Sequence, residues 1–154
     1  MDKKRTVVIG VGNLLFGDEG IGIHAVNELK KEALPPEVEV IDGGAAGLDL
    51  IFMLEGAARA IIIDCTEAEA EPGTIFRIPV TDLALNAPSR AVSLHDISLV
   101  EALALAGKLG KLPPTVIYGV QPGKVTCSTE LSEPVKKNLP RLLSLIRQEM
   151  AVLY

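Results

Sequence analysis

Three acids and one histidine stand at the ends of expected secondary-structure elements. Each acid closes or follows an apolar run that is typical of a buried strand: Glu19, Asp42 and Asp64. His95 precedes a run with helical spacing. Carboxylate oxygens and an imidazole nitrogen suit a first-row divalent ion. Glu19, Asp64 and His95 therefore form a candidate metal site, although their spacing matches no local metal-binding motif.

Ordinary structural roles explain the same acids nearly as well. Asp18 is placed to cap the first helix, because a short acceptor precedes the helical spacing. Glu19 would then be an acid of the first turn, which the helix dipole favours. Asp64 could cap a loop amide. His24 falls among the polar positions of the same helix and is expected at the surface.

The glycine-rich opening does not match a dinucleotide-binding loop. That fingerprint requires glycine at the first, third and sixth positions. Gly10 and Gly12 supply two of these, but Leu15 occupies the sixth. Asp18 and Glu19 would also place negative charge where the helix N-terminus should receive a phosphate. Nucleotide binding is the third and least favoured function considered.

Two arrangements for nucleophilic catalysis are also disfavoured. Cys65 follows Asp64 directly and would point to the opposite face of a strand, away from the acid. Ser93, His95 and Asp96 are close in sequence, whereas the members of a catalytic triad normally converge from distant segments.

Apolar runs rich in β-branched residues alternate with runs of helical spacing. The segment 82–94 shows neither pattern and is expected to be a mobile loop, and Pro140 should kink the last helix or mark its true start. The expected strands are 6–11, 38–41, 59–64, 74–78 and 115–120. The expected helices are 21–33, 48–54, 97–107 and 133–152.

This alternation predicts one α/β domain covering residues 1–154. The chain is 48% hydrophobic but only 3% aromatic, so aliphatic side chains must build its core. Such a composition suits parallel strands covered by helices on both faces. Ligands of these sheets bind beyond the carboxyl ends of the strands, where Glu19, Asp42 and Asp64 would gather.

Charge and composition also limit the partners. A net charge of −5 disfavours binding to nucleic acid. No apolar stretch is long enough to cross a bilayer. Cys65 and Cys127 have no metal-motif spacing and are expected to be reduced thiols of a cytoplasmic protein.

The whole chain resembles the hydrogenase maturation endopeptidases, which trim the C-terminal tail of the large subunit of nickel–iron hydrogenases. The resemblance implies a three-layer α/β/α sandwich around a twisted, mostly parallel five-stranded sheet. It is carried, in the family's order, by the stretches VIGVGNLLFGDEGIG, VIDGGAAG, IIIDC, SLHDISL and YGVQP.

The resemblance also implies roles for individual residues. Glu19, Asp64 and His95 would contact a nickel ion that the precursor supplies, so the metal would not be a resident cofactor. Asp42, with Gly43 and Gly44, would recognise the substrate. The enzyme would be an aspartic-type endopeptidase, with Asp42 or Asp64 as general base.

One departure from the family and one alternative function complete this interpretation. Ala45 replaces the Thr or Ser that the family often carries, which removes one hydroxyl contact. The same acids and histidine would also serve a non-catalytic maturation chaperone that binds nickel or the precursor and cuts nothing. The mass of the precursor after incubation distinguishes the two.

Overall fold

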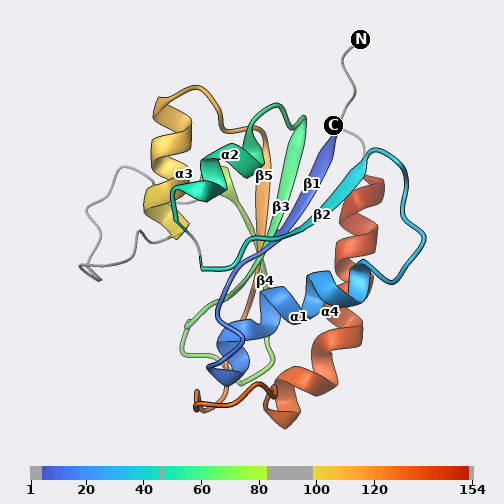
Figure 1. Ribbon diagram of the computed structural model, residues 1–154. Helices are drawn as coiled ribbons and strands as arrows, with labels where there is room; N and C mark the ends of the chain where they lie inside the picture. The colour runs from blue at the N-terminus through green and yellow to red at the C-terminus, as the bar shows by residue number, and fades with distance from the viewer. Residues whose placement is uncertain (1–4, 46, 83–98, 153–154) are drawn as a thin grey trace.

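Five strands form one twisted sheet in the computed structural model, which describes residues 5–45, 47–82 and 99–152. The spatial order is β2-β1-β3-β5-β4 (Figure 1). All neighbouring pairs are parallel except β4 and β5, which are antiparallel. The strands are β1 (Thr6–Gly10), β2 (Val38–Asp42), β3 (Arg59–Cys65), β4 (Ile75–Pro79) and β5 (Thr115–Val120).

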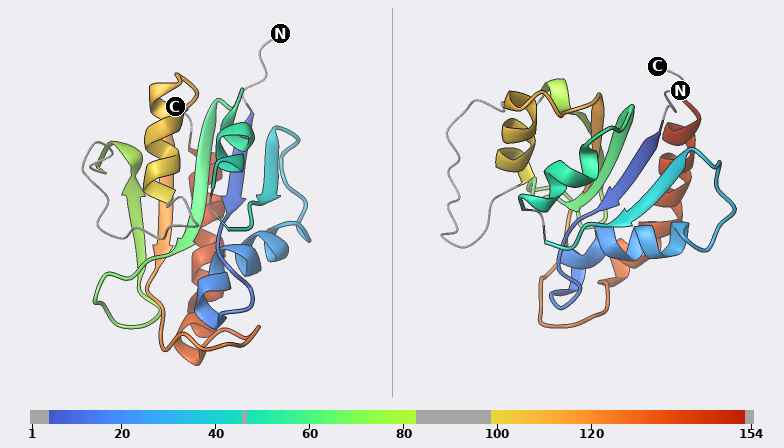
Figure 2. Two further views of the ribbon diagram at one scale, coloured as in Figure 1. Left: turned by 60° about the vertical axis from the view of Figure 1, so that its left-hand side comes forward. Right: turned by 45° about the horizontal axis from the view of Figure 1, so that its top comes forward.

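Helices cover both faces of the sheet, as Figure 2 shows from two directions. One face packs against α1 (Ile21–Leu29) and α4 (Glu133–Ala151). The other packs against α2 (Asp49–Leu54) and α3 (Leu99–Lys108). The three-layer sandwich and the mostly parallel five-stranded sheet are therefore confirmed. None of the helices within the described ranges is both long and apolar enough to cross a membrane.

The central strand β3 shows why these runs are continuously apolar. Ile61 and Ile63 pack on the α1–α4 face, whereas Ala60 and Ile62 pack on the α2–α3 face. Successive side chains of a strand point to opposite faces, so a strand covered on both sides needs an apolar residue at every position. The run ends at Asp64, where cover by the helices ends.

Two glycines let α1 approach the sheet backbone to backbone. Gly10 ends β1 and Gly22 lies in the first turn of α1. A Cβ on Gly10 would overlap the carbonyl oxygen of Gly22, and a Cβ on Gly22 would overlap the carbonyl oxygens of Val11 and Ile63. The glycines of the opening motif therefore determine packing as well as the turn.

Several boundaries differ from those expected. α1 ends at Leu29 rather than Ala33, because the amides of Lys31 and Glu32 bond carbonyls three residues back and tighten the chain into a turn. α4 runs through Pro140 instead of beginning there. The expected loop 82–94 lies almost entirely outside the described residues, as do the first two residues of the expected helix 97–107.

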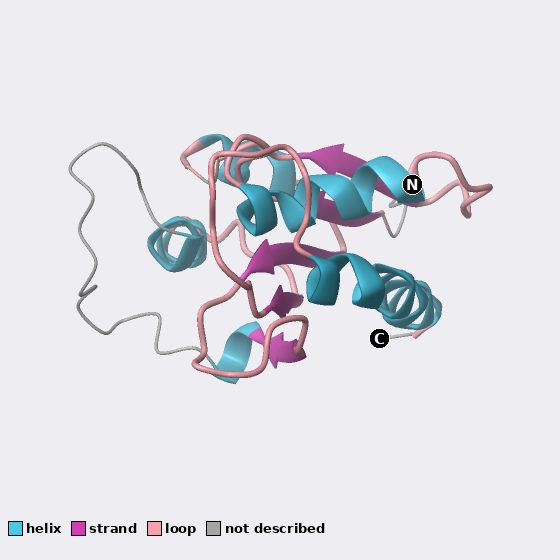
Figure 3. Cartoon of the chain, turned by 90° about the horizontal axis from the view of Figure 1, so that it is seen from below, coloured by secondary structure: helices cyan, strands magenta, loops and turns pink. Residues whose placement is uncertain are grey.

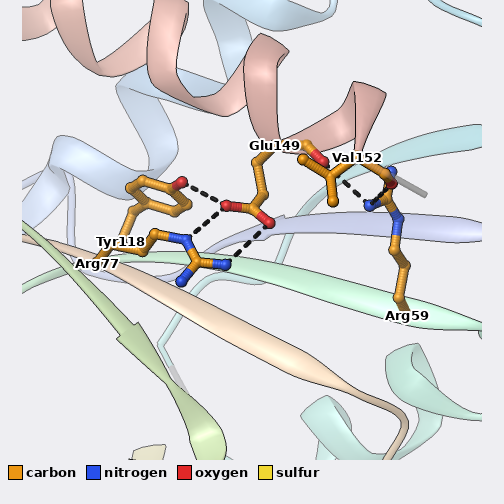
Figure 4. A network of polar contacts seen from close by, with 5 residues as sticks. All are labelled: Arg59, Arg77, Tyr118, Glu149 and Val152. Atoms are coloured by element: carbon orange, nitrogen blue, oxygen red, sulfur yellow. Dashed lines mark hydrogen bonds and ion pairs between the residues drawn. The ribbon is translucent and has the colours of Figure 1, made fainter. Parts of the chain in front are cut away.

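A partly buried ionic network joins the C-terminal part of α4 to strands β3, β4 and β5 (Figure 4). Glu149 is 4% exposed and accepts hydrogen bonds from Tyr118 at 2.6 Å and from Arg77 at 2.7 and 3.2 Å. The guanidinium of Arg59 donates to the main-chain carbonyls of Glu149 and Val152. Each charged group of this network therefore has a hydrogen-bond partner, and the network attaches the end of α4 to the sheet.

Replacement of glycine by alanine should have opposite effects at two positions, of which only one lies in the contact between α1 and the sheet. Gly22→Ala should destabilise the fold by about 2–4 kcal/mol, since the added methyl group meets main-chain atoms that cannot move aside. Gly107→Ala in α3 should be neutral or stabilising by about 0.5 kcal/mol, because its Cβ would have room and alanine favours helix. Urea denaturation measures both. Equal stabilities of the two variants would contradict the packing role of Gly22.

Candidate active site

Glu19 is held in a short 3-10 turn, η1 (Gly17–Gly20), between β1 and α1. Its amide donates to the carbonyl of Phe16 and its carbonyl accepts from the amide of Asn13, both at 3.1 Å. The side chain is half-buried, and η1 contacts β3. The backbone of the turn is thus well supported, while the carboxylate remains available at the carboxyl end of the sheet. Figure 3 looks onto this edge.

Asp64 lies on the neighbouring strand, near the end of β3. The preceding residue, Ile63, is in register with Gly10, the last residue of β1. Asp64 therefore lies level with the start of the turn that carries Glu19. The amide of Cys65 donates to Asp64 Oδ1 at 2.7 Å. This bond leaves the other carboxylate oxygen for a ligand.

Glu19 lies close enough to Asp64 for its charge to affect the ionisation of Asp64. Burial raises the pKa of Asp64 to about 6, the amide of Cys65 opposes this effect, and the negative charge of Glu19 raises the pKa further. None of the ion pairs formed by described residues includes either carboxylate. A pair of acids without a cation has the charge and the donor atoms that a divalent ion requires.

The third expected donor, His95, lies outside the described residues. Within residues 5–45, 47–82 and 99–152, no three His, Cys, Asp or Glu side chains gather closely enough to hold a metal ion. The structure therefore brings Glu19 and Asp64 together, and the part played by His95 stays a prediction.

Asp42 ends β2 and lies exposed on a cleft of about 340 Å³. Its Oδ1 accepts the amide of Gly44 at 2.9 Å, which closes a tight turn. Two further bonds of 2.8 Å, from Gly43 to Gly10 and from Gly12 to Gly44, fasten this turn to the end of β1. The cleft is lined by Gly12, Asn13, Leu14, Ile23, Asp42, Gly44 and Ala45.

Asp42 and Asp64 do not belong to one cluster. Asp42 is in register with Gly10, which is in register with Ile63, so one whole strand separates the two acids and their main chains lie about 10 Å apart. Strand alternation also places them on opposite faces. Asp42 shares the α1–α4 side with Val40, and Asp64 shares the α2–α3 side with Ile62.

Cys65 is no candidate nucleophile. It packs against the core on the α1–α4 side, opposite to Asp64, as strand alternation predicts. Burial, with the negative charge of Asp64 adding to it, raises the pKa of the thiol to about 12. The thiolate needed for attack is therefore not formed near neutral pH.

The sequence-based interpretations of Asp18 and His24, which lie near Glu19 in the chain, are wrong. Asp18 does not cap α1, whose N-cap residue is Gly20 without a side-chain bond; its carboxylate instead binds Gly123 and Ser132. No sequence signal could have revealed a partner 114 positions away. His24 is not fully solvated: it is half-buried, and its Nε2 is buried without a hydrogen-bond partner among the described residues.

Comparison with known proteins identifies the family of the chain. The family model described as hydrogenase maturation protease (HycI) matches residues 23–149. The chain belongs to the hydrogenase maturation protease family. Members of this family and its structural neighbours are endopeptidases, so the chain is an enzyme that hydrolyses peptide bonds, which counts against a chaperone that cuts nothing.

Individual relatives agree with the family assignment. A putative hydrogenase maturation protease of Methanocaldococcus jannaschii is 35% identical over 97% of this chain and 99% of its own length. The hydrogenase expression/formation protein HupD of Bradyrhizobium diazoefficiens is 33% identical over 96% and 78%. The solved structure of the hydrogenase maturating endopeptidase HybD from E. coli has a TM-score of 0.82 at 27% identity, over 95% of this chain and 91% of its own.

The environment of Asp64 predicts that this acid destabilises the metal-free fold near neutral pH. Its pKa is about 6 in the folded chain and about 4 when unfolded. Its contribution to stability is therefore complete below about pH 4, falls between pH 4 and 6, and is lost above. Asp64→Asn should be about 2–3 kcal/mol more stable than the wild type at pH 7.5 and equally stable near pH 4.

Urea denaturation in the presence of a chelator, at both pH values, measures this difference. Asn keeps an oxygen that can accept the amide of Cys65, so the substitution changes charge and little else. Asp49→Asn, which removes an exposed acid in the first turn of α2, is the control for the loss of one negative charge. A stability gain that is absent at pH 7.5, or is the same at both pH values, would contradict the assignment.

Proposed function

We propose that this chain removes the C-terminal extension from the large-subunit precursor of a nickel–iron hydrogenase, and that it recognises the nickel ion already held by that precursor. The convergence of Glu19, in η1, and Asp64, on β3, carries the proposal, since the charge of Glu19 reaches Asp64 and neither acid forms an ion pair among the described residues. The family assignment supplies the class of reaction.

In this proposal the nickel ion belongs to the substrate. Glu19 and Asp64 offer it oxygen donors, and His95 offers a nitrogen donor. His95 stands four positions before Leu99, the first residue of α3, and α3 covers the sheet face to which Asp64 points. Sequence position therefore supports His95 as the third donor. A precursor without nickel would lack this anchor.

The peptide to be cut would occupy the cleft beside Asp42. Residues 12–14, 44 and 45 line this cleft, along which an extended peptide segment would lie. Asp42 is the better general base of the two aspartates, because it is exposed and only its Oδ1 has a partner in the described part of the chain. It would take a proton from the water that attacks the scissile carbonyl.

Because Asp42 and Asp64 lie apart, we assign them different roles in the reaction. With one strand between them, nickel bound at Asp64 lies too far from Asp42 to share its water. We infer that the nickel contact serves recognition, and that Asp42 serves the chemical step. Cys65 and Cys127 are both free thiols, which supports a cytoplasmic location for this reaction.

The test uses purified precursor in nickel-loaded and nickel-free forms, with the intact mass of the product as the readout. The wild type should cut the nickel-loaded form alone. Glu19→Gln and Asp64→Asn should lower kcat/KM at least about 10- to 100-fold by weakening the nickel contact. Asp42→Asn should lower kcat about 100-fold or more while binding of the precursor persists.

Asp49→Asn is the control here as well and should keep the wild-type rate. Equal cleavage of both precursor forms, or full activity of Glu19→Gln, would refute nickel recognition at this site. If the precursor binds to the protein but its mass stays unchanged, the proposed cleavage is refuted.

A further inference from the structure

We propose that Asp18 is a positioning residue of the candidate active site: it clamps the turn between β1 and α1 to the loop between β5 and α4, and thereby holds Glu19 beside Asp64. The consequence for nickel recognition rests on the proposed function, whereas the clamp itself rests on the contacts of the side chain. Figure 1 shows the two connecting segments side by side at the lower edge of the molecule.

The carboxylate of Asp18 is 1% exposed and accepts three hydrogen bonds from the β5–α4 loop. Oδ1 accepts the amide of Ser132 at 2.7 Å. Oδ2 accepts the hydroxyl of Ser132 at 2.7 Å and the amide of Gly123 at 2.8 Å. Three donors converging on one buried carboxylate make a strong attachment, because hydrogen bonds to a charged acceptor are worth more than neutral ones.

Main-chain pairing secures the other side of the same turn. The amide of Ser128 donates to Leu15 at 2.9 Å, and the amide of Gly17 donates to Ser128 at 2.6 Å, which forms a parallel bridge at Phe16. The segment that precedes Glu19 is thus fastened at two successive points, by backbone at residues 15–17 and by a side chain at Asp18.

The role of Ser132 separates this clamp from ordinary helix capping. Ser132 is the N-cap residue of α4, yet its hydroxyl makes no capping bond and is donated to Asp18. Serine at this position normally accepts an amide of its own helix. The clamp accounts for both observations: Asp18 is buried and forms no ion pair with any residue that the structure describes, and the hydroxyl of Ser132 is donated outside its own helix.

Glu19 depends on this attachment because it is the next residue in the turn. Its backbone is held by Phe16 and Asn13 from within the turn, and the turn as a whole is held to the loop through Asp18. If the hydrogen bonds to Asp18 were lost, the turn could move. The carboxylate of Glu19 would then shift relative to Asp64, which is fixed in β3. A nickel ion needs both oxygens at defined positions, so this shift would weaken its recognition.

The experiment compares Ser132→Ala with Tyr118→Phe in the full chain. Each removes one hydroxyl that donates to a buried carboxylate, at 2.7 and 2.6 Å, but Tyr118 binds Glu149 of α4 and not the turn that carries Glu19. Asp18→Asn is the stronger variant, because an amide nitrogen would face a main-chain donor. Ser132→Ala leaves both main-chain bonds to Asp18 in place and should fold if Asp18→Asn does not.

Native-state hydrogen exchange measures the clamp directly. Ser132→Ala should accelerate exchange of the Asn13 and Gly17 amides about tenfold relative to the amide of Ile62, which reports on the core. Tyr118→Phe should change all three amides alike. Uniform exchange in both variants would overturn the positioning role.

The second measurement is the ratio of affinities for nickel-loaded and nickel-free precursor. A purely structural loss lowers the folded fraction and leaves this ratio unchanged, whereas displacement of Glu19 lowers it, by about tenfold on our expectation. Ser132→Thr keeps the hydroxyl and should restore the ratio. An unchanged ratio in Ser132→Ala overturns the link to nickel recognition.

A wild type that binds both precursor forms equally would refute the proposed function, while hydrogen exchange would still decide the role of Asp18.

Discussion

The close approach of α1 to strands β1 and β3 is the constraint on which the rest of the site depends. Gly10 and Gly22 bring two main chains together where any side chain would overlap carbonyl oxygens. With α1 seated at this depth, the residues between β1 and α1 have to fold into a tight turn above the end of the sheet. That turn carries Glu19 to the end of β3, where Asp64 lies.

Glu149 and Asp64 have contrasting surroundings. Glu149 has Tyr118 and Arg77 as partners, and the network stabilises the attachment of α4. At the carboxyl edge, Asp64 is half-buried beside another acid, and its pKa is raised by burial and by the charge of Glu19. Partners neutralise the charge of Glu149, whereas no described cation pairs with Glu19 or Asp64. Keeping these two acids together therefore lowers the stability of the fold, which is typical of functional sites.

On the proposed function, this cost would serve recognition of the substrate. Recognition through Glu19 and Asp64, and cleavage beside Asp42, would place two requirements on a substrate at once. A precursor would need its metal and its peptide in correct relative positions. Strand β1 separates Asp42 from Asp64, so the rigid core would set the spacing that such a substrate has to match.

The amino-acid sequence by itself determined the α/β class, the alternation of strands and helices, and the strand-end positions of Asp42 and Asp64. These follow from local periodicity and from the rule that parallel strands end at one edge, and both are properties of short segments. Strand alternation likewise separated Cys65 from Asp64 correctly. The limits of α1 were less predictable, because local turn bonds end it before its apolar spacing does.

Tertiary structure alone decided which acids meet. Asp42 and Asp64 occupy equivalent places at strand ends, yet the strand order puts β1 between them and the pleat sends them to opposite faces. Asp18 looked like a helix cap and proved to be a buried clamp on Ser132. Contacts of this kind join residues far apart along the chain, and their energies depend on burial and convergence in space, which no local pattern of residues encodes.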